Sequence, residues 1–453
     1  MRSRILATSA LTALALVAPG CASSTAPATQ APPTQAVDRL TAARNAATKA
    51  ADGQRPGGTI NVLGVLNGQQ LDAYLGTFKP FEEVTGTTIK YESTRDLSAV
   101  LQTRIAGGNP PDVVSNPSAG QINQLGTEGR LVALDSIVDI AKVRAEYPAG
   151  LLDLVTAQGK LYGVFFNTAV QGLVWYDPKN YGGPVNPTTW SEVTAWTSQT
   201  AASGHTPWCI GLESGPASGW PGAVWVEEFV LQQAGPAVFD RWWRGEMPWT
   251  SPEIRRAFEQ FGRIASDPKQ VSGGPKAVLT TSFNISPQGL FAKPPACYLH
   301  LQADFLGNAL AQEVPGVKPI TDINFFPFPA LSPDHAGSIE ISGEALSLLK
   351  DTPQGRAFMR YAATPEFSAL VAGTGQWTGA NRQTDPDAYT TELSRRAAKV
   401  YADAKTVRYA AQTAMPPAMT QAFLSAVLAY VKNPSSLDAE LTKLDSVRQS
   451  AYR

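Results

Sequence analysis

The stretch TINVLGVLNGQQLDAYLGTFKPFEEVTGTTIKYES (residues 59–93) decides the fold. It begins with an apolar, β-branched run that is typical of a buried strand. Apolar side chains then recur at helical spacing, at Leu71, Leu75 and Phe78, and the helical pattern ends on a glycine. A second β-prone run, TTIKYES (87–93), follows at once. The stretch therefore predicts a β-α-β unit, which is typical of a parallel sheet.

The same pattern continues along the chain. The segment DLSAVLQTRIAGG (96–108) predicts a second helix, with an aspartate at its start and two glycines at its end. PDVVSNPSA (111–119) predicts a third strand that runs into a loop. Farther on, residues 159–176 are strongly β-prone, and residues 386–452 have a largely helical pattern. This order of elements predicts the α/β fold class.

The carboxyl ends of the predicted strands carry amide side chains. In parallel α/β sheets, ligands bind just beyond these ends. Asn67 and Gln69 follow the first strand, and Asn116 ends the third. Amides form hydrogen bonds but are not nucleophiles, so they favour a binding site over a reaction centre. For Asn67 and Gln69, the alternative interpretation is helix capping.

Composition excludes some classes of partner. The chain has 453 residues, of which 43% are hydrophobic and 17% charged, so it can bury a large core and its length favours more than one domain. Its formal net charge is −1, from 37 basic and 38 acidic residues. Because this balance provides no basic field, we expect no nucleic-acid partner. A neutral molecule or another protein is the expected partner.

The N-terminus has the organisation of an export signal. MRSR is basic, the following apolar run is too short to span a membrane, and small residues precede Cys21. This arrangement resembles a bacterial lipoprotein signal, so we expect residues 1–20 to be a signal peptide and Cys21 to carry lipid. The alternative is an ordinary secretory signal with a chance cysteine. We expect residues 21–57 to be a flexible tether outside the cytoplasm, with the lipid on Cys21 as the membrane contact.

Export also bears on the two remaining cysteines. With Cys21 acylated, Cys209 and Cys297 are left, and two thiols outside the cell most economically form one disulfide. A zinc site is disfavoured, because the chain has 3 His and no CxxC or HExxH spacing. We therefore expect no metal and no other cofactor.

Several longer segments resemble the extracellular solute-binding proteins of ABC importers, in the carbohydrate-binding family. Within that family the chain is most similar to the α-glucoside-binding branch. The broader resemblance rests on FKPFEEVTGTTIKYE, LQTRIAGGNPPDVV, GKLYGVFFNTAVQGLVWYDPKNY and PTTWSEV. The branch resemblance rests on TPWCIGLESGPASGWPGAVWVEEFVLQQAG, LTTSFNISPQGLF, PPACYLHLQADF and FFPFPAL. Together these segments extend over most of the chain from Gly58 to about Tyr430.

The resemblance implies a hinged, two-lobe fold of the type II periplasmic-binding-protein kind. Each lobe is expected to be a mostly parallel sheet flanked by helices. Lobe 1 would comprise 58–166 plus 331–384, and lobe 2 would comprise 167–330 plus 385–453, with a helical C-terminus. A carbohydrate would bind between the lobes, which would close over it and present it to ABC permease subunits on separate chains. The protein would be a monomer and not an enzyme.

Carbohydrate recognition combines polar groups that bind hydroxyls with aromatic rings that cover the C–H face. We expect the ligand-binding residues to be Asn67, Gln69, Asn116, Gln171, Glu213, Trp220, His300, Gln302, Glu344 and Trp377. Each has an alternative structural interpretation. Glu213 could be a surface or cap carboxylate, Trp220 a core anchor, His300 a satisfied structural residue, and Trp377 part of a helix stop.

Two other function classes stay open. An exported glycoside hydrolase could use Glu213 and Glu344 as its carboxylate pair, although no hydrolase motif surrounds them. A binding protein for another small solute, such as a peptide or polyamine, is the second alternative. The sequence does not distinguish among sugars.

Overall fold

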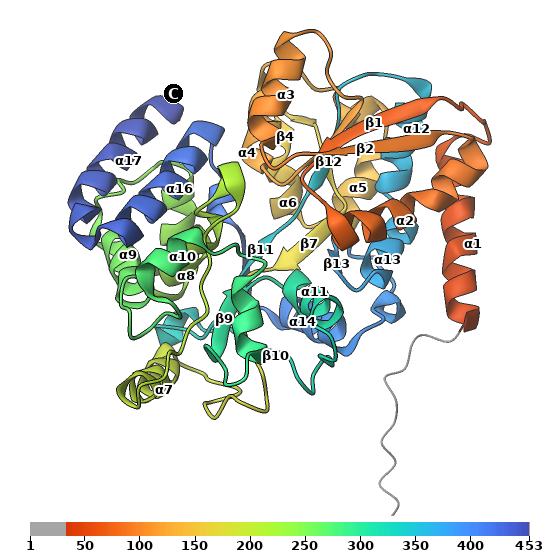
Figure 1. The fold of residues 1–453 in the computed structure, drawn as a ribbon. Coiled ribbons are helices and arrows are strands. Elements are labelled where there is room, and N and C mark those ends of the chain that lie inside the picture. The colour runs from red at the N-terminus through yellow and green to blue at the C-terminus, as the bar shows by residue number, and fades with distance from the viewer. Residues whose placement is uncertain (1–32, 453) are drawn as a thin grey trace, which may run out of the picture.

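The computed structural model describes residues 33–452, which fold into two lobes (Figure 1). The predicted signal peptide and Cys21 lie outside the described residues. Strands β7 (Asn167–Val170) and β11 (Ser338–Ser342) lie between the lobes, and the C-terminus lies at the outer edge of the second lobe. Within residues 33–452, no helix combines the length and apolarity needed to cross a membrane.

The first lobe is built on a five-stranded sheet of order β2-β1-β3-β12-β6. Its strands are β1 (Thr59–Gly64), β2 (Thr88–Ser93), β3 (Val113–Asn116), β6 (Val164–Phe165) and β12 (Ala345–Leu348). Its helices are α2 (Gly68–Thr85), α3 (Leu97–Ala106), α4 (Ala119–Thr127), α5 (Ile140–Glu146), α6 (Ala149–Leu154), α12 (Pro353–Ala362) and α13 (Pro365–Gly373). A short hairpin of β4 (Thr156–Ala157) and β5 (Lys160–Leu161) completes the lobe.

The β-α-β unit predicted over residues 59–93 is confirmed. Strand β1 pairs in parallel with both β2 and β3. Helix α2 buries Tyr74, Phe78 and Phe81, which recur at helical spacing on one face. The helix ends at Gly86, whose φ of 67° is a left-handed conformation that glycine adopts without strain.

The second lobe combines a small sheet with long helices. Its strands have the order β10-β8-β9, with β8 (Leu173–Tyr176), β9 (Leu299–Gln302) and β10 (Asn324–Pro327). Its helices are α7 (Trp190–Ala202), α8 (Trp220–Trp243), α9 (Pro252–Ala265), α10 (Gly274–Thr280), α15 (Ala411–Ala414), α16 (Pro417–Lys432) and α17 (Leu437–Ala451). Helix α8 is kinked at Gly235, where φ is 84° and a proline follows.

The sheets are more mixed than expected. The two-lobe α/β fold is confirmed, but β8 runs antiparallel to both β9 and β10. A third sheet has the order β13-β7-β11-β14, with β13 (Thr378–Gly379) and β14 (Thr406–Tyr409) at its edges. Here β7 is antiparallel to β11, because the chain crosses between the lobes in opposite directions through these two strands. The expectation of mostly parallel sheets therefore applies to β1, β2 and β3 but not to the second lobe.

The sheet β10-β8-β9 separates two hydrophobic cores. On β8, Trp175 belongs to the first core, whereas its neighbours Val174 and Tyr176 belong to the second. On β10, Phe325 and Phe326 divide in the same way. Successive side chains of a strand point to opposite faces, so β8 and β10 contribute to both cores, whereas β9 contributes Leu299 and Leu301 to the second core. Helices α11 (Phe305–Glu313) and α14 (Glu392–Asp403) also contribute apolar side chains to the first core.

The predicted tether is shorter than residues 21–57. Helix α1 (Pro33–Ala50) packs against α2, α12 and α13 at the edge of the first lobe (Figure 1). Ala43 and Ala47 are fully buried there, and Arg44 forms an ion pair with Glu83 at 2.7 Å. Because alanine side chains are small, the helix lies close to its neighbours and is held without large apolar residues. The sequence prediction underestimated this alanine face.

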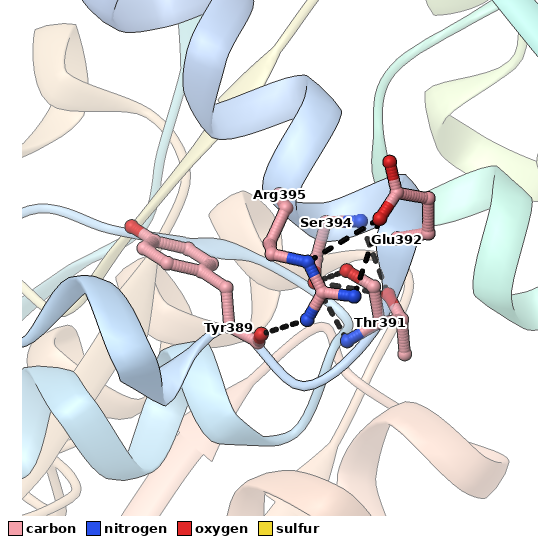
Figure 2. Close-up of polar contacts among 5 residues, drawn as sticks. All are labelled: Tyr389, Thr391, Glu392, Ser394 and Arg395. Atoms are coloured by element: carbon pink, nitrogen blue, oxygen red, sulfur yellow. Dashed lines mark hydrogen bonds and ion pairs between the residues drawn. The ribbon is translucent and has the colours of Figure 1, made fainter. Parts of the chain in front are cut away.

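The start of helix α14 fixes a loop beside the crossover strands (Figure 2). The Thr391 hydroxyl accepts a hydrogen bond from the Ser394 N–H at 3.0 Å, and the Arg395 guanidinium donates to the Tyr389 carbonyl at 2.9 Å. Tyr389 in turn accepts a hydrogen bond at its hydroxyl from the N–H of Gly379 at 3.2 Å. Since Gly379 pairs with Asn167 of β7, this cap braces the edge strand β13.

Candidate functional site

Glu344 lies at the junction of the first-lobe sheet and the crossover strands, between β11 and β12. Its side chain is mostly buried, with the residue 8% exposed. The carboxylate accepts a hydrogen bond from the Ser115 hydroxyl at 3.0 Å. Its backbone N–H donates to the Asn167 side-chain oxygen at 2.7 Å. These contacts fix the carboxylate beside the carboxyl end of β3.

The surroundings of Glu344 bring the pKa of its carboxyl group close to neutral pH. Burial raises the pKa of Glu344 to about 7, while the Ser115 hydroxyl and the charge of Arg95 lower it. Burial raises the pKa of Tyr74, of Tyr91 and of Tyr409, and the charge of Glu344 adds to each of these rises. Three tyrosines therefore lie close enough to this carboxyl group to sense its charge.

Arg95 connects the two lobes. It lies in the loop between β2 and α3, and its guanidinium donates a hydrogen bond to the Ser214 hydroxyl at 2.5 Å. The same guanidinium lies 5.5 Å from the centre of the Phe283 ring. Burial lowers the pKa of Arg95, and the charges of Glu344 and Glu213 raise it. The guanidinium of Arg95 thus lies within electrostatic reach of one carboxylate from each lobe, Glu344 and Glu213.

Glu213 and Trp220 supply the second-lobe side of this group. Glu213 is half-buried, and one of its carboxylate oxygens accepts the N–H of Gly215 at 2.8 Å. Trp220 begins helix α8, and its ring meets the Phe283 ring edge-on at 5.2 Å between centres. The cap interpretation of Glu213 therefore holds for one oxygen, and the residue still lies within the electrostatic reach of Arg95.

The predicted disulfide between Cys209 and Cys297 is confirmed, with the two Cα atoms 5.4 Å apart. The N–H of Cys209 also donates to the Leu299 carbonyl at 2.8 Å, which joins the segment to β9. The N–H of Glu213 donates to the Thr281 carbonyl at 3.1 Å. The disulfide and these bonds hold the segment that carries Glu213 against the body of the second lobe.

Trp377 lies in an aromatic group next to Glu344. Its ring meets Tyr74 at 6.3 Å and Phe166 at 6.2 Å, both edge-on. Tyr74 and Phe166 are stacked at 4.4 Å. Trp377 is 4% exposed, so it shapes the wall behind Tyr74 more than it presents an open face.

Asn67 and Gln69 are exposed at the start of α2. Asn67 occupies the N-cap position but forms no side-chain cap bond, so the capping alternative is not realised there. The N–H of the preceding Leu66 donates to the Tyr91 hydroxyl at 3.2 Å, which places this turn beside the tyrosines around Glu344. Ligand contact by Asn67 and Gln69 stays a prediction.

The other predicted residues are engaged inside the protein. Asn116 donates to Gln121 at 2.9 Å and accepts the N–H of Ser118 at 2.8 Å. Gln171 donates to the Ser342 hydroxyl at 2.5 Å. All of these side chains have hydrogen-bond roles within the fold, and their contact with a ligand stays a prediction.

His300 and Gln302 lie on β9, on the face that carries Trp175. His300 is 3% exposed, and its Nδ1 is hydrogen-bonded to the Cys209 carbonyl at 2.8 Å. Burial lowers the pKa of His300 to about 4, so the imidazole is neutral at pH 7. The Gln302 side-chain oxygen accepts the N–H of Ala303 at 2.9 Å. We therefore do not include these two residues in the proposed site.

Sequence reasoning missed Arg95, the tyrosines around Glu344, and Phe283. Arg95 had an available signal, because it follows the carboxyl end of the second predicted strand, where the same rule selected Asn67 and Asn116. Tyr409 had no such signal. It reaches the site from a distant segment, with its hydroxyl donating to the Gly343 carbonyl at 2.8 Å.

A second group of carboxyls lies along β11. Glu340 faces helix α8, where it meets Glu227 and Glu228, and all three are at most 1% exposed. The Glu340 and Glu227 carboxyls lie close enough for each to shift the pKa of the other. Glu227 also accepts the N–H of Gln412 at 2.6 Å. We refer to Glu227, Glu228 and Glu340 as the carboxyl triad.

Burial raises the pKa of each member of the carboxyl triad, to about 7 for Glu227 and to about 8 for Glu228. For Glu340 the charges of the other two members raise the pKa further, well above its usual range. Within residues 33–452, no group of three or more His, Cys, Asp or Glu side chains is arranged to hold a metal ion. In the triad, burial and the proximity of like charges thus favour the protonated carboxyl groups.

Four surface hollows of the described residues are lined by neither Glu344 nor Arg95. One of about 550 Å³ lies between α7 and α9 and is lined by residues such as Trp190 and Arg263. Another of about 450 Å³ lies between α4 and the C-terminal part of the second lobe. The group around Glu344 is instead drawn together by the contact that Arg95 makes across the lobes.

Comparison with known proteins identifies the family. Residues 66–369 match the family described as bacterial extracellular solute-binding protein. The chain is 32% identical over 375 residues to the osmoprotective compounds-binding protein GgtB of Synechocystis, covering 82% of this chain and 88% of that protein. It is also 32% identical over 396 residues to the alpha-glucosides-binding periplasmic protein AglE of Rhizobium meliloti, covering 84% and 85%.

Solved structures support the fold. A chitin oligosaccharide binding protein superposes with a TM-score of 0.74 at 19% identity, over 87% of this chain and 98% of that chain. The maltose-bound MalE3 of T. maritima superposes with a TM-score of 0.67 at 14% identity, over 87% of this chain and 100% of that chain. At these identities the likeness shows the two-lobe fold alone. By its sequence match and its fold, this chain belongs to the bacterial extracellular solute-binding protein family, whose members are binding proteins and not enzymes.

Proposed function

We propose that this protein captures a neutral carbohydrate between its two lobes and delivers it to the permease subunits of an ABC importer. One observation carries the proposal. Glu344 of the first lobe and Glu213 of the second both lie within electrostatic reach of Arg95, whose guanidinium contacts Ser214 and the Phe283 ring across the lobes, and the Trp220 ring lies beside Phe283. Carboxylate, guanidinium and aromatic groups in one place provide hydrogen bonds for sugar hydroxyls and apolar faces for sugar rings.

The ligand class we propose is an α-glucoside or a related di- or oligosaccharide. AglE, to which the chain is similar over most of its length, is named for alpha-glucosides. The site has two carboxylates and one guanidinium, so it has no surplus of positive charge for an anionic ligand. The proposed contact residues are Arg95, Glu213, Trp220 and Glu344, with Tyr74, Tyr91 and Trp377 behind them.

Isothermal titration calorimetry with maltose, trehalose, sucrose and longer glucans tests this function. We expect saturable binding of at least one sugar, lost or strongly weakened in Glu344→Gln. Glu246→Gln is the matched control, because Glu246 is an exposed carboxylate of the second lobe. No heat and no thermal shift across the panel would refute carbohydrate binding and favour another small solute. Sugar turnover that disappears in Glu213→Gln would favour the hydrolase alternative.

The membrane attachment and the domain division are also proposals. We propose that Cys21 carries lipid and that the described body begins at α1. Cys21→Ser should release the exported protein from the membrane fraction, whereas a Cys209→Ser, Cys297→Ser double variant should stay attached. Apart from α1, we propose lobe boundaries at 58–166 plus 331–384 and at 167–330 plus 385–453, and a monomer as the transport-competent form.

A further inference from the structure

Arg95 makes contacts across the lobes that go beyond sugar recognition. Its loop continues directly into α3, whose Leu97 and Leu101 are buried in the first core. Ser214 and Phe283, which it contacts, belong to the second lobe. This inference rests on the proposed function, since it concerns the regulation of the same site.

The guanidinium of Arg95 is chemically suited to hold two separable lobes together. A guanidinium has five N–H donors in a rigid plane, so it can bond one partner while its face covers an aromatic ring. Here one edge donates to the Ser214 hydroxyl at 2.5 Å, and the plane lies near the Phe283 ring at 5.5 Å. Ser214 is 6% exposed, so the bond is shielded from water and is stronger than a surface contact.

The partners of Arg95 differ in which lobe they belong to. Glu344 is held by first-lobe groups through Ser115. Glu213 is held by second-lobe groups through Gly215 and Thr281. When the lobes separate, Arg95 keeps its proximity to Glu344 but loses Ser214, Phe283 and Glu213. The geometry therefore gives one side chain a different set of partners in the open and closed arrangements, as a two-state element requires.

We propose that Arg95 is a latch that stabilises the closed arrangement before any sugar binds, so that Arg95 sets the closure equilibrium of the free receptor. Arg95 is in this sense a positioning residue, because it acts through the placement of the lobes. A sugar then binds to a receptor whose lobes are already partly closed, which reduces the conformational cost of capture.

The expected effect on closure is large enough to measure. One charge-assisted hydrogen bond together with one cation–π contact is expected to change the closed-to-open ratio by about 10-fold to 100-fold. Loss of the latch should raise the sugar dissociation constant by up to that factor, since capture then includes closing the lobes, and loss of the proposed Arg95–sugar contact should add to this rise.

Distances between spin labels measured by pulsed electron resonance test the latch. Gln102 on α3 and Ser425 on α16 are exposed, one on each lobe, so Gln102→Cys and Ser425→Cys provide the labelling sites. The full chain carries Cys21→Ser, and the disulfide-bonded Cys209 and Cys297 do not react. The distances are compared without sugar and with saturating maltose.

We expect the unsubstituted receptor to show mostly the short distance without sugar. Arg95→Ala should shift it to the long distance, and Arg95→Lys should give an intermediate distribution, because lysine keeps the charge but not the planar fork. Arg104→Ala is the matched control. Arg104 lies on α3 and pairs with Glu92 of its own lobe at 2.6 Å, so its loss should leave the distances unchanged.

An Arg95→Ala distribution identical to that of the unsubstituted receptor without sugar would overturn the latch. Arg95→Lys provides the same test if Arg95→Ala melts at a lower temperature. The comparison without sugar decides this inference even if no sugar in the panel binds. If no sugar in the panel binds, the proposed function is refuted. The distance comparison without sugar still tests the latch.

Discussion

Two groups of buried carboxyls lie near β11, and they differ in the groups that surround them. Glu344, just beyond the end of the strand, has the Ser115 hydroxyl and the Arg95 cation to stabilise its ionised form. The carboxyl triad, along the strand, has burial and mutual repulsion that favour protonation. Arg408, paired in register with Glu340, instead forms an ion pair with Asp240 at 2.8 Å.

This difference is the basis for proposing Glu344 as a sugar-binding carboxylate and the triad as structural. A carboxylate that serves a ligand must be able to ionise, and the Ser115 hydroxyl and the charge of Arg95 favour the ionised form of Glu344. The carboxyls of the triad are at most 1% exposed, and burial and the charges of neighbouring members raise the pKa of Glu228 and Glu340. The burial of an acid therefore does not by itself identify a site; a site also needs groups that stabilise the charge of the acid.

The largest expected effect follows from releasing the segment that holds Glu213. A Cys209→Ser, Cys297→Ser double variant should lose about 4 kcal/mol of unfolding free energy, because the disulfide closes a loop with a sequence separation of 88 residues. It should also weaken sugar binding, while the pH dependence of stability that the triad causes remains. Urea unfolding measures the first effect and calorimetry the second. Unchanged stability in the variant, or in the reduced protein, would contradict the bracing role.

The triad should make the protein less stable at alkaline pH. The pKa of Glu227 rises from 4.5 to about 7 and that of Glu228 to about 8, so the folded state binds these protons more tightly than the unfolded state. The stabilisation is complete below about pH 4.5 and is lost as the pH rises through 7 to 8. A rise of this size corresponds to about 3 kcal/mol for one carboxyl group.

Urea unfolding at pH 5, 7 and 9 measures this dependence. Glu340→Gln should reduce the loss between pH 5 and pH 9 by removing one of the three charges. Glu246→Gln, at an exposed position, should have the same profile as the unsubstituted protein. A triad variant with an unchanged profile would show that these carboxyls do not retain their protons.

Glu344→Gln should weaken sugar binding by about 10-fold to 100-fold. The amide keeps the shape of the side chain but loses the charge, and a hydrogen bond to a charged group is worth about 1.5–3 kcal/mol. Calorimetry gives the dissociation constant. Glu340→Gln serves as the contrasting variant, since the triad is closed to ligand and its loss should leave affinity within about twofold. If Glu344→Gln and Glu340→Gln weakened sugar binding equally, Glu344 and the carboxyl triad would not differ in function.

Sugar affinity should itself depend on pH through Glu344. The pKa of this carboxyl is about 7, and sugar hydroxyls donate best to the ionised form. Binding should therefore weaken as the pH falls below about 7, by about threefold to tenfold at pH 6. The dependence should vanish in Glu344→Gln. Affinity that is constant from pH 5.5 to pH 8 would indicate that the ligand does not contact this carboxylate.

The smallest effect is expected at the start of α2. Asn67→Ala should weaken sugar binding by about twofold to fivefold, because an exposed amide contributes one hydrogen bond of about 0.5–1 kcal/mol. Stability should change little, since Asn67 forms no side-chain cap bond. A loss as large as that of Glu344→Gln would place the centre of the site at this turn.

Sequence patterns predicted the parts of this molecule that local rules govern. The β-α-β unit followed from residue spacing, and the disulfide followed from thiol count and export. The alanine face of α1 was missed because packing by small residues leaves little periodic signal. The antiparallel strands of the second lobe were missed because chain direction through β7 and β11 is a long-range property.

The proposed site overlaps the residues predicted from the sequence only in part. Strand-end and turn positions led to Glu213, Trp220 and Glu344, which the structure brings close to Arg95. The carboxyl triad was not predictable, because Glu227 and Glu228 occur in a helical segment where adjacent acids usually face water. They are buried where α8 packs against β11, whose Glu340 lies more than a hundred residues away in the sequence.

The sheet β10-β8-β9 has a consequence for how the protein unfolds. Strands β8 and β10 place alternate side chains in both cores, so neither core can be exposed without removing one wall of the other. Even if the lobes rotate about the crossover strands as proposed, they should melt together, with one calorimetric transition in place of two. A gene fragment encoding either lobe alone would leave the aromatic face of this sheet uncovered. The mobility that capture requires is thus combined with cooperative unfolding of the whole chain.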